Sequence, residues 1–231
     1  MNKIVAFMRA APASARETFQ NDILTMANAG LDEIIGAVAL HVNLVLLPPP
    51  NLPYRPPSDP GVGKPPEYDV IVEAWSTAEA SAVAQRLHKA MIGKTSVIHA
   101  YAVTHKQIYN RKAFSRGRPS AGIKLMGRLM FHADLPDTAA MRSWGLHAPL
   151  AARVHVGSAI YVQNWVLGAL SADCPPARGI PIMHFPTDVD FFDGFVDSPR
   201  GMQEILQDTS HFVASGPRFY TTEHIIRAAN T

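Results

Sequence analysis

Residues 141–164, MRSWGLHAPLAARVHVGSAIYVQN, predict a helix, a turn and a strand, and similar units recur along the chain. Trp144 and His147 lie one helical turn apart, so they share a face of the predicted helix. The strand that follows carries Tyr161 and Asn164. An aromatic ring, an imidazole, a phenol and an amide thus gather in a short stretch, which makes it the first candidate for a functional site.

The sequence on both sides of this stretch predicts further strands and helices. Residues 123–132 alternate apolar side chains with Lys, Met, Arg and His, which is typical of a strand. Pro199, which follows Asp197 and Ser198, suits the first position of a helix. The predicted elements of this half are a strand 123–132, a helix from Asp137, a strand 157–167, a loop 171–181, a strand 189–196, a helix from Pro199 and a strand 218–226.

The first half of the chain predicts the same order of elements. Ser14 and Glu17 form a capping box, with Ser14 as the N-cap of a helix that Gly30 ends. Residues 48–66 hold nine prolines and two glycines, so they predict an extended excursion between two strands. The predicted elements are a strand 3–9, a helix 14–29, strands 34–47 and 68–75, a helix 83–91 and a strand 96–109.

Each half therefore predicts a ferredoxin-like βαββαβ unit. Asn43 and Asn164 fall at the same point of the second strand, and residues 73–75 align with residues 193–195. Such a unit leaves one sheet face bare, and two units in one chain can bury their bare faces together. We predict an α+β fold of two fused ferredoxin-like repeats whose antiparallel sheets pack into a barrel. The predicted domains are residues 1–110 and 123–231, joined by a linker at 111–122.

Composition excludes several classes of protein. A formal charge of +2 over 231 residues is too small for a nucleic-acid-binding surface. No apolar run reaches the roughly 20 residues of a membrane span, and the lone Cys174 cannot form an intramolecular disulfide. A cytoplasmic protein is therefore expected. Only 17% of the residues are charged, which indicates that domain packing or pairing into a homodimer covers part of the surface.

Three motifs resemble the EthD-like branch of the dimeric α+β barrel superfamily, here as a tandem fusion. They are Trp144-Gly-Leu-His147-Ala-Pro-Leu150, Tyr161-Val-Gln-Asn164 and Asp193-Gly-Phe-Val-Asp-Ser198-Pro. The resemblance covers most of residues 122–228. The first half matches in layout, with Thr25 in the place of His147 and Asp22 near that of Trp144. The resemblance therefore implies one site per chain, in the C-terminal half.

The same resemblance implies a class of activity. Relatives in this family include cofactor-free lyases, dehydratases, cyclases and oxygenases that act on aromatic or polyketide-like compounds. We therefore predict a cofactor-independent lyase, dehydratase, cyclase or isomerase with a small-molecule substrate. The alternatives are a non-catalytic small-molecule-binding accessory protein and a cofactor-free oxygenase of a phenolic substrate.

His147 is the candidate for proton transfer, because an imidazole titrates near neutral pH. Trp144 would form a wall of the cavity. Tyr161 and Asn164 would hold a substrate hydroxyl or an enolate oxygen. The alternative is that His147 and Trp144 pack on the sheet, with His147 bonded to a backbone carbonyl.

Further candidates extend the predicted site. Arg128, on the polar face of the strand 123–132, would act with Tyr161 as a catalytic residue on an oxyanion, or would bind a carboxylate or phenolate. His132 on that face is predicted to bind substrate, as are His184 and Phe185 in the loop before the third strand. The histidines are scattered and have no nearby carboxylate on one element, so no metal site is predicted.

Overall fold

The chain passes twice through the order strand, helix, two strands, helix, strand. The computed structural model describes residues 1–52, 64–111 and 119–228. The first half contains β1 (Asn2–Ala10), α1 (Arg16–Met26), the π-helical turn η1 (Ala27–Leu31), α2 (Asp32–Ile35), β2 (Ala39–Val45), β3 (Val70–Ser76), α3 (Ala80–Ala90), β4 (Thr95–Val103) and β5 (Lys106–Asn110). The second half contains β6 (Ile123–Gly127), β7 (Met130–Phe131), α4 (Asp137–Val154), β8 (Ile160–Ala169), β9 (Gly179–Phe185), α5 (Asp188–Phe192), α6 (Pro199–Ser210), β10 (Val213–Ser215) and β11 (Arg218–Arg227).

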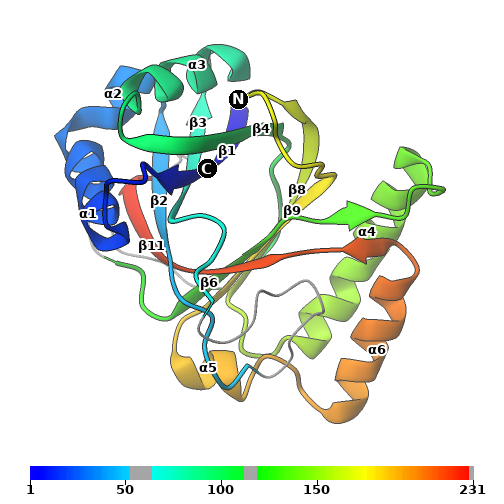
Figure 1. Cartoon of the computed structure of the whole chain (residues 1–231). Helices are drawn as coiled ribbons and strands as arrows, with labels where there is room; N and C mark the ends of the chain where they lie inside the picture. The colour runs from blue at the N-terminus through cyan, green and yellow to red at the C-terminus, as the bar shows by residue number, and fades with distance from the viewer. Residues whose placement is uncertain (53–63, 112–118, 229–231) are drawn as a thin grey trace.

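Eight of these strands close into one antiparallel barrel (Figure 1). Their order is β4-β1-β3-β2-β11-β6-β9-β8, and β8 pairs with β4 to complete the ring. The β2–β11 and β8–β4 pairings join the two halves, while β5 adds a short extension beside β8. Figure 1 shows α1, α2 and α3 on one side of the barrel and α4, α5 and α6 on another. The prediction of an α+β barrel built from two ferredoxin-like repeats is confirmed.

Successive residues of each strand face opposite sides of the barrel wall. Along β1, Val5 and Phe7 belong to the core inside the barrel, whereas Ile4, Ala6 and Met8 belong to the core beneath the helices. This period of two residues decides which side chains share a cavity. No helix of the described residues is long and apolar enough to cross a membrane.

The third strand of the second half lies earlier than the sequence predicts. Residues 179–185 form β9, although a loop was expected there because of Gly179 and Pro181. Pairing with β6 on one side and β8 on the other outweighs these turn residues. Residues 189–196, the predicted strand, instead include α5, whose N-cap Thr187 accepts a hydrogen bond from the Asp190 backbone. The alignment of residues 73–75 with 193–195 is therefore wrong, since β3 corresponds to β9.

The first helix also departs from the prediction. Its N-cap is Ala15 and no side chain caps it, so the Ser14–Glu17 capping box is wrong. Gly30 takes φ 103°, which is not helical, and ends the first helical segment as predicted, but a second helical segment, α2, follows directly. Buried residues recur at every fourth position through both segments: Ile23, Ala27, Leu31 and Ile35. This apolar stripe holds residues 32–35 in a helix, where the sequence suggested the start of a strand.

Smaller differences concern strand lengths and two irregular segments. The predicted strand 96–109 is divided into β4 and β5, and the predicted strand 123–132 into β6 and β7. Within the proline-rich segment 48–66 and the predicted linker 111–122, residues 53–63 and 112–118 lie outside the described part of the chain.

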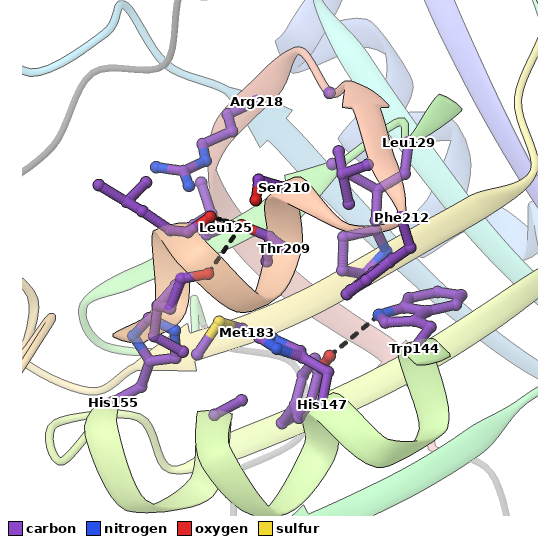
Figure 2. Close-up of a pocket in the computed structure, with 18 of the residues that line it drawn as sticks. Leu125, Leu129, Trp144, His147, His155, Met183, Thr209, Ser210, Phe212 and Arg218 are labelled. Carbon is purple, nitrogen blue, oxygen red and sulfur yellow. Dashed lines mark hydrogen bonds between the residues drawn. The ribbon is translucent and has the colours of Figure 1, made fainter. Parts of the chain in front are cut away.

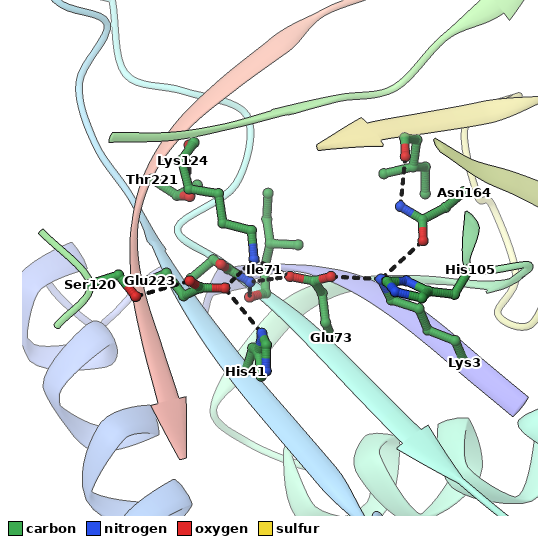
Figure 3. A network of polar contacts seen from close by, with 12 residues as sticks. Lys3, His41, Ile71, Glu73, His105, Ser120, Lys124, Asn164, Thr221 and Glu223 are labelled. Carbon is green, nitrogen blue, oxygen red and sulfur yellow. Dashed lines mark hydrogen bonds and ion pairs between the residues drawn. The ribbon is translucent and has the colours of Figure 1, made fainter. Parts of the chain in front are cut away.

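A network of buried charges crosses the barrel between the halves (Figure 3). Glu73 of the first half accepts bonds from Lys124 of the second half and from Lys3, the latter at 2.7 Å. Lys124 also binds Glu223, which lies 3.0 Å from Nδ1 of His41. The side chains of Lys3, Glu73, Lys124 and Glu223 are at most 5% exposed.

Mutual pairing keeps Lys124, Glu73 and Glu223 charged in spite of their burial, whereas burial lowers the pKa of Lys3. Burial opposes the charge of Lys124, but Glu223 and Glu73 together raise its pKa. Burial likewise opposes the charge of Glu73, yet Lys124 and Lys3 hold the pKa of its carboxyl well below the usual range. At neutral pH each carboxylate therefore faces an ammonium group, and the loss of one partner leaves a buried charge uncompensated.

Lys124→Met is expected to lower the free energy of unfolding by about 3–5 kcal/mol, because it leaves Glu73 and Glu223 without their shared cation. Urea unfolding followed by circular dichroism measures the loss. Lys94→Met removes an exposed lysine and should change stability by less than about 0.5 kcal/mol. A Lys124→Met chain as stable as the Lys94→Met chain would contradict the role given to the network.

Candidate active site

A pocket of about 560 Å³ opens between helices α4 and α6 and the outer face of the second half's sheet (Figure 2). Its volume is in the range of small-molecule sites. Most of its wall is apolar and comes from Leu125, Leu129, Trp144, Ala151, Pro181, Met183, Phe195, Met202, Ile205, Leu206, Phe212 and Val213. The polar side chains that line it are His147, His155, Tyr161, Thr209, Ser210, Ser215 and Arg218.

Helix α4 places the aromatic and imidazole side chains on this wall. Its buried residues form one stripe at helical spacing: Ala140, Trp144, His147, Ala148, Ala151 and Val154. The indole of Trp144 packs over the backbone of Gly179 in β9. A Cβ atom at position 179 would lie 2.7 Å from the indole, so this contact requires glycine. The small alanines of the stripe let α4 approach the sheet, and its larger members reach the pocket.

His147 is held by a carboxylate of the facing helix. Its Nδ1 lies 2.6 Å from Oδ2 of Asp208 in α6. Because a carboxylate only accepts hydrogen bonds, Nδ1 carries the proton and Nε2 carries the lone pair. Burial lowers the pKa of His147, and the hydrogen bond that its Nδ1 donates to Asp208 offsets part of this effect. The imidazole is therefore neutral at pH 7 and has the form of a general base.

Tyr161 presents a hydroxyl close to this base. Its oxygen accepts hydrogen bonds from Nε1 of Trp144 at 3.1 Å and from Nε2 of Gln163 at 3.0 Å. Two accepted bonds leave the phenolic proton as the group that Tyr161 can offer to a ligand. Burial raises the pKa of Tyr161 to about 12, so the hydroxyl stays protonated. The centres of the Tyr161 and His147 rings lie 6.5 Å apart, so both side chains belong to the same part of the pocket.

A second imidazole and a cation occupy another part of the pocket. Nδ1 of His155 donates to the backbone carbonyl of Phe195, and burial lowers the pKa of His155 to about 4. The guanidinium of Arg218 lies 5.5 Å from the centre of the Phe195 ring. Figure 2 shows Arg218 and His155 on one side of the pocket and Trp144 and Phe212 on the other.

Three of the predicted site residues, Trp144, His147 and Tyr161, line this pocket together. Asn164 and His184 instead face the inside of the barrel. The Asn164 side chain accepts from Lys3 at 2.9 Å and donates to the Ile180 carbonyl at 2.8 Å. Asn164 is three residues from Tyr161 along β8, so the alternation of a strand directs the two side chains to opposite faces.

The other predicted residues also lie outside the pocket. Phe185 faces the helices but packs against Phe191, with ring centres 5.3 Å apart. Arg128 donates to the Tyr68 hydroxyl at 2.7 Å and pairs with Glu67. These contacts follow from its place on the inward-facing side of the strand that begins with β6.

His132 has a structural contact at the edge of the site. Its Nε2 lies 2.9 Å from the backbone carbonyl of Ser210, which fastens the segment after β7 to the end of α6. The prediction that Arg128, His132, Asn164, His184 and Phe185 share the cavity with His147 is therefore not supported by their positions.

Sequence reasoning missed Asp208 and Arg218. Asp208 lies in α6, and its pairing with His147 depends on how α6 meets α4. Arg218 had a detectable signal, since the alternation along β11 places it on the same face as Tyr220, which packs in the core beneath the helices. The same alternation places Arg128 on the inner face of the barrel wall and Arg218 on the outer face, where the pocket lies.

The first half differs from the second in the space beneath its helices. The space beneath α1, α2 and α3 is filled by a core that includes Phe19, Ile23 and Leu87. A smaller pocket, of about 240 Å³, lies beside α3 and β4. Asp22 and Thr25, the sequence counterparts of Trp144 and His147, lie on the exposed face of α1, so this alignment does not place them on a buried stripe.

One cluster in the barrel has ligand types that metals use. The ligand atoms of His41, Glu73 and Glu223 lie within 4.8 Å of one another. The ammonium of Lys124 bonds to both carboxylates and already supplies a positive charge there. The cluster is therefore better described as an ion network than as a metal site.

Comparison with known proteins shows which solved structures share this fold. No protein-family model matches the sequence, and no curated protein matches it. A solved anthrone oxidase-like protein aligns over 100% of this chain and 95% of its own, with a TM-score of 0.58 and 11% identity. A monooxygenase-like protein from Lactobacillus acidophilus NCFM aligns over 99% and 97%, with a TM-score of 0.55 and 10% identity.

A chlorite dismutase from Candidatus Nitrospira defluvii aligns over 97% of this chain and 91% of its own, with a TM-score of 0.53 and 12% identity. These matches show that the chain shares its antiparallel α+β barrel fold with these proteins. At these identities the likeness concerns the fold alone.

Asp208→Asn is expected to lower the pKa of His147 further, because the carboxylate that favours the imidazolium is removed while burial remains. The His147 ring resonances in an NMR pH titration report this change. Glu204→Gln is the matched control, since it breaks another contact between α6 and α4, with Arg153, and should leave the titration of His147 unchanged. A raised or unaltered pKa in Asp208→Asn would contradict the assigned geometry.

Proposed function

We propose that this chain is an EthD-like, cofactor-independent enzyme that moves a proton on a small aromatic or polyketide-like compound. The observation that carries the proposal is the His147–Asp208 pair in an apolar pocket, beside the hydroxyl of Tyr161. Abstraction of a proton next to a carbonyl needs two groups. One is a base, here the neutral imidazole with its oriented lone pair, and the other is a hydrogen-bond donor to the developing oxyanion, here the nearby O–H group.

The proposed reaction begins at a carbon atom next to a substrate carbonyl. Nε2 of His147 removes the proton, and the electron pair of the C–H bond moves into the carbonyl to give an enolate. Asp208 stabilises the imidazolium that forms, through the bond to Nδ1. Tyr161 donates its hydroxyl proton in a hydrogen bond to the enolate oxygen, while Trp144 and Gln163 hold the phenol in place.

The fate of the enolate decides the overall reaction. Return of the proton to another carbon is an isomerisation, loss of a β-hydroxyl as water is a dehydration, and attack on a second carbonyl is a cyclisation. In each case the proton on His147 is given back to the product or to the leaving group. The apolar wall supports all three, since it excludes water and strengthens the hydrogen bonds to the enolate.

The motif resemblance to EthD-like proteins supports this assignment, because its His147 and Trp144 are the residues that meet in the pocket. The structural neighbours described as anthrone oxidase-like and monooxygenase-like favour a second candidate, a cofactor-free oxygenase. There His147 would deprotonate a phenol, and the electron-rich anion would pass an electron to dioxygen as the co-substrate. Oxygen dependence separates the candidates, because only the oxygenase loses turnover under anaerobic conditions.

His147→Ala is expected to lower the rate of proton abstraction by about 10²–10⁴-fold. Exchange of solvent deuterium into 2-tetralone, followed by NMR, measures this step with a flat ketone whose C–H bonds are acidic. His88→Ala removes an exposed histidine of α3 and should keep the wild-type rate. Added imidazole should restore part of the rate in His147→Ala, which a purely structural role would not produce.

Equal exchange by the wild-type and His147→Ala chains would remove His147 from catalysis. If binding of the ketone is measurable and no exchange occurs in the wild-type chain, the result would favour the accessory, ligand-binding alternative.

Cofactor independence gives a further prediction. Deuterium exchange by the wild-type chain should persist after dialysis against EDTA, and the purified chain should have no visible absorption band from a flavin or a metal complex. Loss of exchange after dialysis, with recovery on adding back a divalent metal, would contradict the proposal.

A further inference from the structure

The pocket contains a second imidazole that the proposed reaction does not use. His155 follows the last residue of α4, and its backbone N–H donates to the carbonyl of Ala151 at 2.9 Å. It lines the pocket together with His147, and their separation in sequence corresponds to about 12 Å along a helix axis. Figure 2 shows the two side chains at different places along α4. A ligand group that meets His155 is therefore remote from the atom that reacts at His147.

Contacts with the segment after α5 fix the orientation of the His155 ring. Its Nδ1 bonds to the backbone carbonyl of Phe195, and the centre of the Phe195 ring lies 5.1 Å from that of the imidazole. The backbone N–H of Asp197 donates to the Val154 carbonyl at 2.8 Å, which holds this segment against the end of α4. Since a carbonyl only accepts hydrogen bonds, Nδ1 of His155 carries the proton and Nε2 carries the lone pair.

Nε2 of His155 is an acceptor that a ligand can reach. Within residues 1–52, 64–111 and 119–228, no group donates a hydrogen bond to this atom. The residue is only 5% exposed, yet Nε2 is not one of the enclosed polar atoms that lack a partner. We take its exposed surface to face the pocket that His155 lines.

This acceptor persists through the proposed reaction. Burial lowers the pKa of His155 to about 4 in spite of the bond to Phe195, and a positive charge on His147 lowers it further. The His155 ring is therefore neutral at pH 7, also when His147 holds the substrate proton. A neutral imidazole with a fixed Nδ1 proton can only accept a hydrogen bond at Nε2.

Two hydroxyl groups of the pocket wall already have acceptors of their own. Thr209 donates to the carbonyl of Ile205 at 2.8 Å, and Ser210 donates to that of Gln207 at 2.7 Å. Both protons are thus used within α6. When a ligand displaces water from this mostly apolar pocket, an unpaired acceptor is unfavourable, so the ligand itself has to supply the donor.

From these contacts we infer that His155 selects a substrate with a hydroxyl group, which donates to Nε2 while the acidic C–H bond lies at His147. The ligand class is a hydroxylated aromatic ketone, with its hydroxyl on the ring remote from the ketone. An ether oxygen or a carboxylate at this position has no proton to donate. The placement of the C–H bond rests on the proposed function, whereas the recognition of the hydroxyl by His155 does not.

Three matched ketones test this selection. 6-Hydroxy-2-tetralone carries the donor, 6-methoxy-2-tetralone has a methyl group in place of its proton, and 2-tetralone has neither group. Isothermal titration should show that the wild-type chain binds the hydroxy ketone about 3- to 10-fold more tightly than the other two, which is the effect of one neutral hydrogen bond. In nitrogen NMR, the Nε2 signal of His155 should shift with the hydroxy ketone and stay in place with the methoxy ketone.

Variants assign the preference to one residue. His155→Phe keeps a flat ring and removes the acceptor, so it should bind the hydroxy ketone no more tightly than 2-tetralone, with its affinity for 2-tetralone near that of the wild-type chain. His155→Gln should keep part of the preference, because its side-chain oxygen can take the place of Nε2. The matched controls His147→Ala and His88→Ala should keep the full preference.

Equal affinity of the wild-type chain for the three ketones, or no binding of the hydroxy ketone, would overturn the proposal, whether or not His155→Phe folds. A preference that survives in His155→Phe would overturn it as well, as would an unchanged Nε2 signal. The outcome is independent of turnover. A preference for the hydroxyl without deuterium exchange would remove the proposed function alone, and exchange without that preference would remove the present inference alone.

Discussion

The closed barrel depends on the contact of Lys124 with Glu73 and Glu223. Closing the ring takes the inner faces of both half-sheets out of water, and these faces carry charged as well as apolar side chains. A buried charge is stable only when an opposite charge meets it. Glu73 comes from the first half and Lys124 and Glu223 from the second, so the charges are balanced when the halves meet in this register. Lys3 and Asn164 make a similar contact across the halves at 2.9 Å.

These charged and apolar side chains pack the inside of the barrel. The pocket that could hold a ligand lies on the outer face of the barrel wall. Two spaces exist there, one beneath the helices of each half. In the first half, large apolar residues such as Phe19, Ile23 and Leu31 fill the space as core. In the second half, α4 and α6 stand over the sheet with His147 and Asp208 between them, and a cavity remains. The two halves of a repeated scaffold thus differ in the space beneath their helices.

Much of this arrangement follows from patterns within single elements. The alternation of strands and helices, and the bare sheet face that each half would expose, predict the closed barrel. The spacing of Trp144 and His147 in a helix correctly places both on its buried face. Tyr161 and Asn164 were grouped by closeness in sequence, although a separation of three residues sends strand neighbours to opposite faces. The same rule separates Arg128, on the barrel side, from the pocket.

Other features require the tertiary structure. The bond between His147 and Asp208 joins residues on two helices that lie 61 positions apart in the sequence, and no local pattern specifies it. The position of β9 depends on its pairing with β6 and β8, which overrides the turn-forming residues Gly179 and Pro181. Long-range pairing outweighs local propensity at these points, so a single sequence mispredicts them.

The most direct test of the central claim is a crystal structure of the chain with a flat aromatic ligand bound. The account predicts electron density between α4, α6 and the outer face of the sheet, within hydrogen-bond distance of Nε2 of His147. Density only inside the barrel, or beneath the helices of the first half, would contradict it.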